Sequence, residues 1–352
     1  MIKEGVAPIQ IKHKRVGQRW CFLTNLVVMS SIMMATGCSS EQSINPQLST
    51  APSSIASKPV ADKQTVYPLV LKDACGAEVT IPSEPQRVAV DNAELNDFMK
   101  VIGASDKIVE VTEDSASSLW GARERIIAKS KPDFFLYPAP SVLVYPGSEM
   151  CMNIQSFRTL GFPIWVTGHS EIDQIASDML TVGIILNRRE PAEQASDKLG
   201  KAIAQVKEAR QGLPLKKVYW ERGYNRSFSK SNQVSSVGVG KNTLEDDLLS
   251  TAGGENILPW VDNQSPDSIP ITLEQLRKAD PDLILYQNYF RSPEYVPPKE
   301  REEWQNLRAI RTSQLYAYPF DEMRYSELSD NLMTLLKAIH PEALSRITEM
   351  RD

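Results

Sequence analysis

The chain has 352 residues, of which 41% are hydrophobic and 24% charged, and its formal net charge is −5 at pH 7. An acidic balance of this kind argues against nucleic acid as a partner. The length is that of two domains or lobes rather than one, so a sizeable core is expected in each.

Residues 1–37 have the pattern of an export signal. A basic region precedes an apolar stretch over residues 21–34, which is shorter than the ~20 apolar residues of a membrane-spanning helix. The basic side chains are Lys3, Lys12, Lys14, Arg15 and Arg19. Cleavage after residue 37 would remove these five positive charges and one negative charge, so the net charge would move from −5 to −9.

The segment that follows resembles a bacterial lipobox. Its residues are Ala35-Thr36-Gly37-Cys38, with Ala35 where such boxes usually carry leucine. The resemblance implies that Cys38 receives a lipid and becomes the mature N-terminus, so the protein is exported and anchored to a membrane, facing the periplasm or the cell exterior. The alternative is a plain cleaved signal with a chance cysteine. Residues 38–66, rich in Ser, Ala, Pro and Gln, are predicted to be a flexible tether.

If Cys38 carries a lipid, two cysteines remain in the mature chain. Cys75 and Cys151 would then lie in an oxidising compartment, which favours a disulfide between them. Two buried free thiols are the alternative.

Residues 67–170 are predicted to form an N-terminal α/β lobe. Short apolar runs bounded by Pro, Gly or Asp alternate with helical patterns, which is typical of a largely parallel sheet. The predicted strands are RVAVDN (87–92), KIVEVT (107–112), DFFLYP (133–138) and PIWVTG (163–168).

Residues 171–212 are predicted to be helical and to include the helix that joins the lobes. Apolar residues recur at helical spacing in two runs, and Pro191 suits the first turn of the second run. The βα alternation resumes over residues 213–352, which predicts a C-terminal α/β lobe. Its expected elements are the strands KVYWER (217–222), DLILYQ (282–287) and LYAYP (315–319) and the helix TLEDDLLSTAGG (243–254).

The sequence lacks the motifs that are typical of several kinds of catalytic, metal-binding and nucleotide-binding sites. The mature chain has two histidines, His169 and His340, far apart and in different predicted lobes, and it lacks CxxC, HExxH, GxSxG and a glycine-rich phosphate loop. We therefore expect no catalytic residues, no metal site built by the protein and no intrinsic cofactor. An exported hydrolase acting on a siderophore-like substrate is the weaker alternative.

An opening segment and six that follow it in register carry a resemblance to a known family. YPLVLKDACGAEVTIPSEPQRVAV (67–90) resembles the opening of the periplasmic binding proteins of iron-siderophore and cobalamin ABC importers. The segments that follow in the family's order are KPDFFLYP, FRTLGFPIWV, LLSTAGGENIL, ITLEQLRKADPDLILYQ, EEWQNLRAIRTSQLYAYP and LLKAIHPEAL. The resemblance covers residues 67–344 and implies two α/β lobes joined by one long helix, with a ligand held in the cleft between them.

The family resemblance also implies partners. In such receptors one glutamate on each lobe docks onto the permease, and the matching positions are Glu124 and Glu274. Glu124 fits less closely, because AKSKPD is one residue longer than the usual segment. We expect a monomeric receptor that hands its ligand to an ABC permease and its ATPase.

A ferric siderophore is the first predicted ligand. Guanidinium and tyrosine hydroxyl groups suit the oxygens of such chelates. Arg324 is at a position where related siderophore receptors carry a cleft arginine, and other candidates follow two predicted strands. These are Arg222, Tyr224 and Arg226 after the first, and Tyr289 and Arg291 after the second. Iron would arrive wrapped in its chelator rather than bound chiefly by side chains.

A corrinoid is the alternative ligand. Cobalamin receptors pack their large, mostly neutral ligand with aromatic side chains, and Trp120 and Trp260 lie near the positions of the family's cleft tryptophans. Tyr137 and Tyr145 would serve either ligand.

Overall fold

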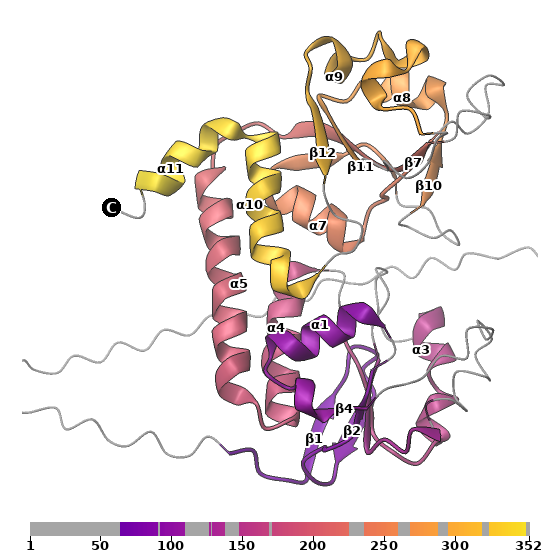
Figure 1. Cartoon of the computed structure of the whole chain (residues 1–352), viewed down its shortest axis with the longest axis vertical. Coiled ribbons are helices and arrows are strands. Elements are labelled where there is room, and N and C mark those ends of the chain that lie inside the picture. Colours follow the sequence, from indigo (N-terminus) through magenta and orange to yellow (C-terminus); the bar gives the residue numbers. More distant parts are fainter. Residues whose placement is uncertain are drawn as a thin grey trace, which may run out of the picture. The chain divides into compact units, whose positions relative to one another are not determined.

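The computed structural model describes ten parts of the chain: residues 64–90, 92–109, 127, 129–137, 148–168, 171–224, 236–259, 268–287, 295–318 and 324–349. All belong to one unit, Val60–Asp352. Its strands form a hairpin and two separate sheets, with helices beside and between them (Figure 1). The export signal, Cys38 and most of the tether lie outside the described residues.

A β-hairpin opens the first lobe. β1 (Leu69–Lys72) pairs antiparallel with β2 (Glu78–Ile81). One aspartate closes the turn, because Asp73 Oδ1 accepts hydrogen bonds from the backbone N–H groups of Cys75 and Ala77, both at 3.0 Å. Side-chain hydrogen bonds of this kind are why aspartate favours turns.

The predicted disulfide is present. Cys75, in the hairpin turn, is bonded to Cys151 in α3 (Glu149–Asn153). Both cysteines are buried in a small apolar cluster with Phe135 and Phe157. The bond therefore fastens the hairpin turn to the first lobe.

The first sheet has four strands, all parallel, in the order β4-β3-β5-β6. These are β4 (Ile108–Val109), β3 (Val88–Ala89), β5 (Phe134–Tyr137) and β6 (Ile164–Val166). Every residue of β3, β5 and β6 is buried, as expected of parallel strands covered on both faces. The other elements of this lobe are α1 (Ala93–Val101), η1 (Ser105–Lys107) and η2 (Phe157–Thr159).

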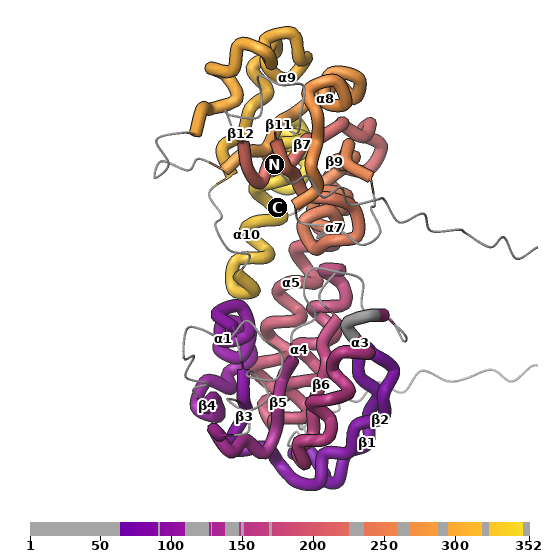
Figure 2. The backbone as a smooth tube through the Cα atoms, turned by 90° about the vertical axis from the view of Figure 1, so that its right-hand side faces the viewer, coloured from indigo at the N-terminus to yellow at the C-terminus, as the bar shows by residue number. Residues whose placement is uncertain are grey.

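Two antiparallel helices connect the sheets. α4 (Ile172–Ile185) and α5 (Arg189–Ala209) match the two predicted helical runs. They approach closely at Gly183, where an added Cβ would lie 2.2 Å from the Cβ of Ala192. At ~1.5 Å per residue, α5 is about 30 Å long. It contacts α1 and α4 of one lobe and α7 and α10 of the other (Figure 2). It also contacts α11.

The second sheet is parallel at its centre and antiparallel at one edge. The strand order is β10-β8-β7-β11-β12, with β9 also pairing with β7. β9, β11 and β12 run parallel to their neighbours, and β8 and β10 run antiparallel. The strands are β7 (Lys216–Tyr224), β8 (Ser236–Gly238), β9 (Gly254–Asn256), β10 (Ile269–Ile271), β11 (Leu283–Gln287) and β12 (Leu315–Tyr318).

Short helices complete the second lobe, and the chain then returns to α5. The α-helices are α7 (Leu244–Thr251), α8 (Leu273–Ala279), α9 (Arg308–Arg311), α10 (Leu328–Ile339) and α11 (Leu344–Glu349). The 3₁₀ helices are η3 (Pro298–Glu300), η4 (Glu302–Trp304), η5 (Tyr325–Glu327) and η6 (Pro341–Ala343). α10 packs on α5, and η5 packs on α1.

One hydrophobic core extends through both lobes. It includes Phe98 of α1, Val206 of α5, Leu248 of α7 and Leu332 of α10, all 0% exposed. The predicted class is confirmed: two α/β lobes with mostly parallel sheets, bridged by a long helix.

Candidate functional site

Two of the predicted ligand residues lie in the last part of β7. Arg222 and Tyr224 belong to the strand itself rather than to a following loop, because β7 continues to Tyr224 by pairing with β8. The register of this pairing shifts between Glu221 and Gly223. The shift is a local irregularity of the kind that redirects side chains at the end of a strand.

Arg222 forms an ion pair with Glu245, in the first turn of α7. The Glu245 side chain is 4% exposed, and its Oε2 has no hydrogen-bond partner among the described residues. Burial and the Glu245 charge raise the pKa of Tyr318, the last residue of β12. An arginine, a carboxylate and a phenol thus meet where parallel strands β7 and β12 end, the usual location of a ligand site in an open α/β sheet.

A buried charge cluster holds this end of β7. Arg301 and Glu221 are 0% and 1% exposed and form a bidentate ion pair, with one N–O distance of 2.8 Å. Ser236 Oγ donates to Glu221 at 3.2 Å, and Tyr295 donates to its other oxygen at 3.3 Å. Arg301 Nε donates to the carbonyl of Val296 at 2.8 Å. The pair therefore has the additional hydrogen bonds that a buried ion pair requires.

Tyr224 belongs to the same cluster. The guanidinium carbon of Arg301 lies 3.7 Å from the centre of its ring and 4.2 Å from that of Trp304. The Tyr224 hydroxyl donates to Glu303 at 2.8 Å. These contacts fix the Tyr224 ring before any ligand arrives.

Arg324 lies at the junction of the two lobes. It lines a pocket of about 250 Å³ together with residues of α1, namely Ala93, Glu94, Asn96, Asp97 and Lys100. Its side chain is exposed, and its guanidinium has no ion pair among the described residues. The neighbouring Ser326 donates through its backbone N–H and its hydroxyl to Asp97, at 2.8 and 3.0 Å.

Two other predicted residues are also described. Tyr137 is 3% exposed and packs edge-on against Phe135, with ring centres 5.6 Å apart, so the structure places it in the core. Glu274 is exposed in the first turn of α8, which begins with a capping box formed by Thr272 and Gln275. The remaining predicted residues lie outside the described part of the chain: Arg226, Tyr289, Arg291, Tyr145, Trp120, Trp260, Glu124 and Cys38.

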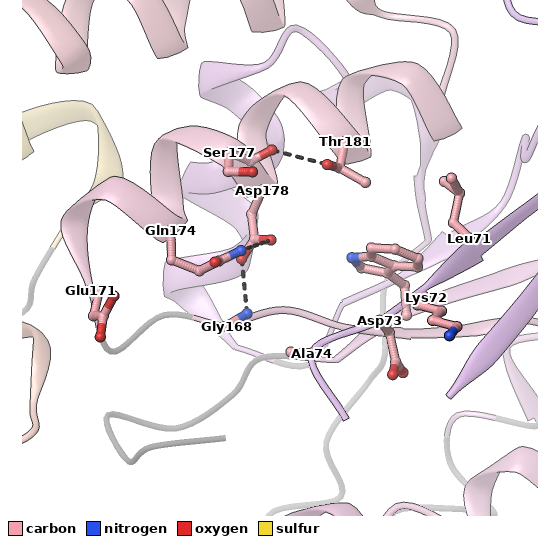
Figure 3. Close-up of a pocket in the computed structure, with 11 residues that line it drawn as sticks. Leu71, Lys72, Asp73, Ala74, Gly168, Glu171, Gln174, Ser177, Asp178 and Thr181 are labelled. Atoms are coloured by element: carbon pink, nitrogen blue, oxygen red, sulfur yellow. Dashed lines mark hydrogen bonds between the residues drawn. The ribbon is translucent and has the colours of Figure 1, made fainter. Parts of the chain in front are cut away.

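A separate pocket of about 500 Å³ lies within the first lobe (Figure 3). Its walls are the hairpin turn, the residues at the end of β6 and the exposed side of α4. Asp178 on α4 accepts hydrogen bonds from Gly168 N–H at 2.8 Å and from the Gln174 amide at 3.1 Å. None of the predicted ligand residues lines this pocket.

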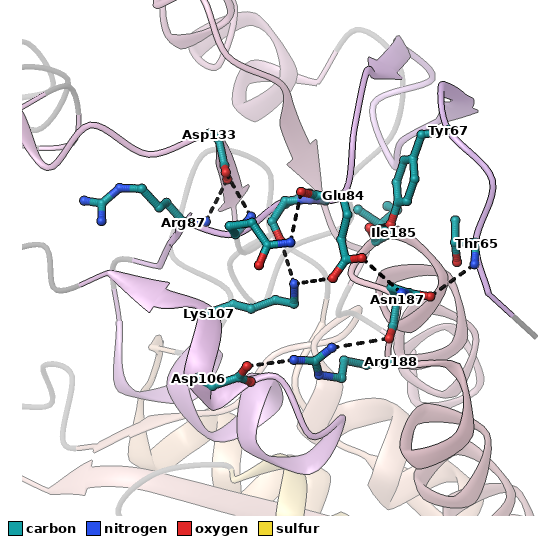
Figure 4. Close-up of polar contacts among 12 residues, drawn as sticks. Thr65, Tyr67, Glu84, Arg87, Asp106, Lys107, Asp133, Ile185, Asn187 and Arg188 are labelled. Atoms are coloured by element: carbon teal, nitrogen blue, oxygen red, sulfur yellow. Dashed lines mark hydrogen bonds and ion pairs between the residues drawn. The ribbon is translucent and has the colours of Figure 1, made fainter.

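Another polar cluster in the first lobe is structural (Figure 4). Lys107, 2% exposed, donates to Glu84 and to the carbonyl of Pro85, both at 2.7 Å. The hydrogen bond from Lys107 lowers the pKa of Glu84, whose other oxygen accepts from Asn187 at 3.0 Å. Asn187 in turn accepts from Thr65 N–H at 3.1 Å. This network ties the segment around the hairpin to the turn between α4 and α5.

Sequence reasoning missed the carboxylates and the arginine that shape these sites. Glu221 directly follows the apolar Val218-Tyr219-Trp220, and Asp178 directly precedes the apolar Met179-Leu180, but each also has a polar neighbour, so the signal in the sequence is weak. Arg301 and Glu245 carry no such signal, since each is one of several charges in a polar stretch.

Two further observations concern metal-binding groups and membrane-spanning helices among the described residues. They contain no group of three or more His, Cys, Asp or Glu side chains arranged to hold a metal ion. Their helices include none with the length and hydrophobicity needed to cross a membrane.

Comparison with known proteins agrees with the fold. Residues 154–322 match a family model described as periplasmic binding protein. The vitamin B12-binding protein of Yersinia pestis (strain Pestoides F) is 25% identical over 220 residues, which are 59% of this chain and 71% of that protein.

Solved structures share the two-lobed architecture. The ABC-type Fe3+-hydroxamate transport system protein of Saccharomonospora viridis DSM 43017 has a TM-score of 0.53 and 17% identity, over 78% of this chain and 99% of that one. The periplasmic vitamin B12 binding protein of Vibrio cholerae has a TM-score of 0.56 and 15% identity, over 75% and 99% of the two chains. These findings confirm the resemblance predicted from the sequence: residues 154–322 match the model of periplasmic binding proteins, and the chain has the fold of such proteins.

Proposed function

We propose that this protein is the substrate-binding receptor of an ABC importer and that it captures a ferric siderophore between its lobes. The observation that carries the proposal is the position of Arg324, an exposed guanidinium of the second lobe that lines a pocket with α1 of the first. A cation at this junction is suited to the oxygen atoms of a chelate held by both lobes. The ligand would be bound and released unchanged.

A corrinoid is the second candidate, and two observations favour it. The curated relative described above is named for vitamin B12 binding. Arg222, the second arginine proposed for an anionic ligand, is already paired with Glu245, which reduces the positive charge that it offers. A mostly neutral ligand would tolerate that pairing better than a strongly anionic chelate would.

The proposal includes docking to a permease and anchoring by a lipid on Cys38. Glu274 supports docking, because it is exposed on the first turn of α8 and has no ion pair among the described residues. Such a carboxylate is free to meet an arginine of another protein, although a solvated surface carboxylate is the default for this residue type.

Ligand binding by the purified protein tests the proposal. We expect a ferric hydroxamate such as ferrichrome to quench tryptophan fluorescence with a dissociation constant below about 1 μM, and Arg324→Ala to weaken binding about tenfold. Arg311→Ala, which removes an exposed arginine of α9, is the matched control and should bind as the wild type does.

The other outcomes separate the candidates. Binding of cyanocobalamin with no response to ferrichrome or ferric enterobactin would favour the corrinoid receptor. If the protein binds neither ferric siderophores nor cyanocobalamin, the whole proposal is contradicted. Turnover of the siderophore, detected by mass spectrometry, would revive the hydrolase alternative.

A further inference from the structure

The pocket in the first lobe has features of a binding site of its own. At about 500 Å³ it falls within the range of ~300–1,000 Å³ that small-molecule sites occupy. Its lining residues come from the hairpin turn, the end of β6 and α4 (Figure 3). It is thus distinct from the pocket that Arg324 lines at the junction of the lobes.

One wall of the pocket holds a buried carboxyl group without a cation. Asp178 is 5% exposed and has no ion pair in the part of the chain that the structure describes. A carboxylate offers about four lone-pair sites, and the bonds from Gly168 and Gln174 occupy two of them. Burial raises the pKa of Asp178 to about 7, so a bound cation would stabilise its charged form.

A second wall holds an unpaired donor. Trp165 is 3% exposed and lines the pocket, and its indole Nε1 has no hydrogen-bond partner among the described residues. An indole N–H can only donate, so a ligand group that pairs with it must be an acceptor, such as a hydroxyl oxygen. Ser177 and Thr181 add hydroxyl groups on the exposed side of α4.

The charged residues around the pocket determine whether a cation or an anion is favoured as its ligand. The ionisable lining residues are Lys72, Asp73, Glu171 and Asp178, and Asp73 is already paired with Arg158. When Asp178 is ionised, the residues that line the pocket and Arg158 together have a net charge of −1. An anion is therefore disfavoured. A bare metal ion is disfavoured as well, because the described residues offer no group of three ligands.

We propose that this pocket binds a small polyhydroxylated amine, with its ammonium group on Asp178 and a hydroxyl oxygen accepting from Trp165. An ammonium group fills the free lone-pair sites of the carboxylate with charge-assisted hydrogen bonds. Hydroxyl groups both accept and donate, so they satisfy the indole and also the hydroxyls of α4. The site is independent of the ligand proposed for the lobe junction.

The probe is D-glucamine, a polyol with one terminal ammonium group. The matched control is sorbitol, which has a hydroxyl group in place of the ammonium group. By isothermal titration calorimetry at pH 8 we expect D-glucamine to bind with a dissociation constant of about 1 mM or lower, and sorbitol at least tenfold more weakly. Asp178→Asn should weaken D-glucamine binding at least tenfold, and Trp165→Phe about threefold. Asp173→Asn, an exposed position on the same helix, should have no effect.

The pH dependence gives an independent readout. With Asp178 titrating near pH 7, binding should weaken about tenfold between pH 8 and pH 6 in the wild type and remain constant in Asp178→Asn. The titratable groups around Asp178 are Lys72, Asp73 and Glu171 in the lining and Tyr325 from η5. Histidine side chains ordinarily have a pKa of about 6.5, and His169 follows Gly168 in the sequence, so the measurement is repeated in His169→Gln, which should behave as the wild type does.

Two controls make the result decisive. Thermal unfolding shows whether Asp178→Asn is folded, which is expected because the substitution removes a buried charge. Arg324→Ala should bind D-glucamine as the wild type does, and this would distinguish the pocket from the lobe junction. The proposal is overturned if D-glucamine does not bind below 10 mM, if folded Asp178→Asn binds it equally well, or if Arg324→Ala weakens it as much as Asp178→Asn does.

Discussion

Arg301 and Glu221 are the most deeply buried ion pair described in the second lobe. Removing two charges from water costs several kcal/mol per ion, and only excellent geometry with additional hydrogen bonds offsets that cost. This pair has both, since the arginine is bidentate and lies over aromatic rings while the carboxylate also accepts from Ser236 and Tyr295. The function of the pair is therefore to hold the end of β7 in one conformation.

Removing only one member of this ion pair should strongly destabilise the protein. We expect Arg301→Met to lower the free energy of unfolding by about 3–5 kcal/mol, because it leaves the Glu221 carboxylate buried and unpaired. The double variant Arg301→Met/Glu221→Leu should recover most of the loss. Arg308→Met, which removes the ion pairs of an exposed arginine with Asp280 and Asp282, should cost at most about 1 kcal/mol. Urea denaturation measures all three, and a loss below about 1 kcal/mol in Arg301→Met would contradict the argument.

The partner of a single residue was predictable from the sequence only where few residues of the required type were available. The pairing of Cys75 with Cys151 was predictable because the predicted export signal implies an oxidising compartment and the predicted lipobox would account for Cys38. Arg222 was predicted on a loop after the strand but lies in β7 itself, and its partner Glu245 was not found. That pairing depends on how α7 packs beside β7, and no local pattern in the sequence reports it.

At the scale of elements, α4 shows that a sequence pattern can predict a helix and its buried face without predicting a charged residue on that face. Apolar residues at helical spacing predicted this helix. Those residues, Ile172, Ile175, Met179, Val182 and Ile185, are all buried. Asp178 is buried as well, although it is charged in its ordinary state. Helical spacing indicates which positions are covered, but it does not say that a carboxyl group is among them.

The buried carboxyl of α4 makes stability depend on pH. The pKa of Asp178 is about 7 in the folded protein and ordinarily 3.8, so between these values the folded state holds a proton that the unfolded state has released. The free energy of unfolding should therefore fall as pH rises from about 4 to 7, with Asp178 contributing up to about 4 kcal/mol. We expect Asp178→Asn to lack this contribution, as measured by urea denaturation at several pH values. Equal slopes in both proteins would show that Asp178 titrates normally.

At the scale of the whole molecule, each lobe supplies an aspartate to the start of a helix in the other. Asp247 of α7 accepts from Ile172 N–H at 2.8 Å, at the beginning of α4, and Asp97 of α1 accepts from Ser326 in η5. Carboxylates are favourable at such helix starts. These partners are 75 and 229 residues apart, so the strands and helices were predictable from local patterns while the contacts between lobes were not.

The proposed receptor would present one surface to its permease while its ligand stays bound elsewhere, and Glu274 allows these two proposed properties to be tested separately. We expect Glu274→Ala to reduce ligand uptake by cells at least tenfold and to leave the dissociation constant of the purified protein unchanged, because Glu274 is exposed and does not line the pocket of Arg324. Glu255→Ala, an exposed glutamate of β9 in the same lobe, is the matched control and should transport normally. A loss of affinity in Glu274→Ala would place Glu274 in the ligand site instead. Normal uptake by this variant would mean that α8 makes no essential contact with the permease.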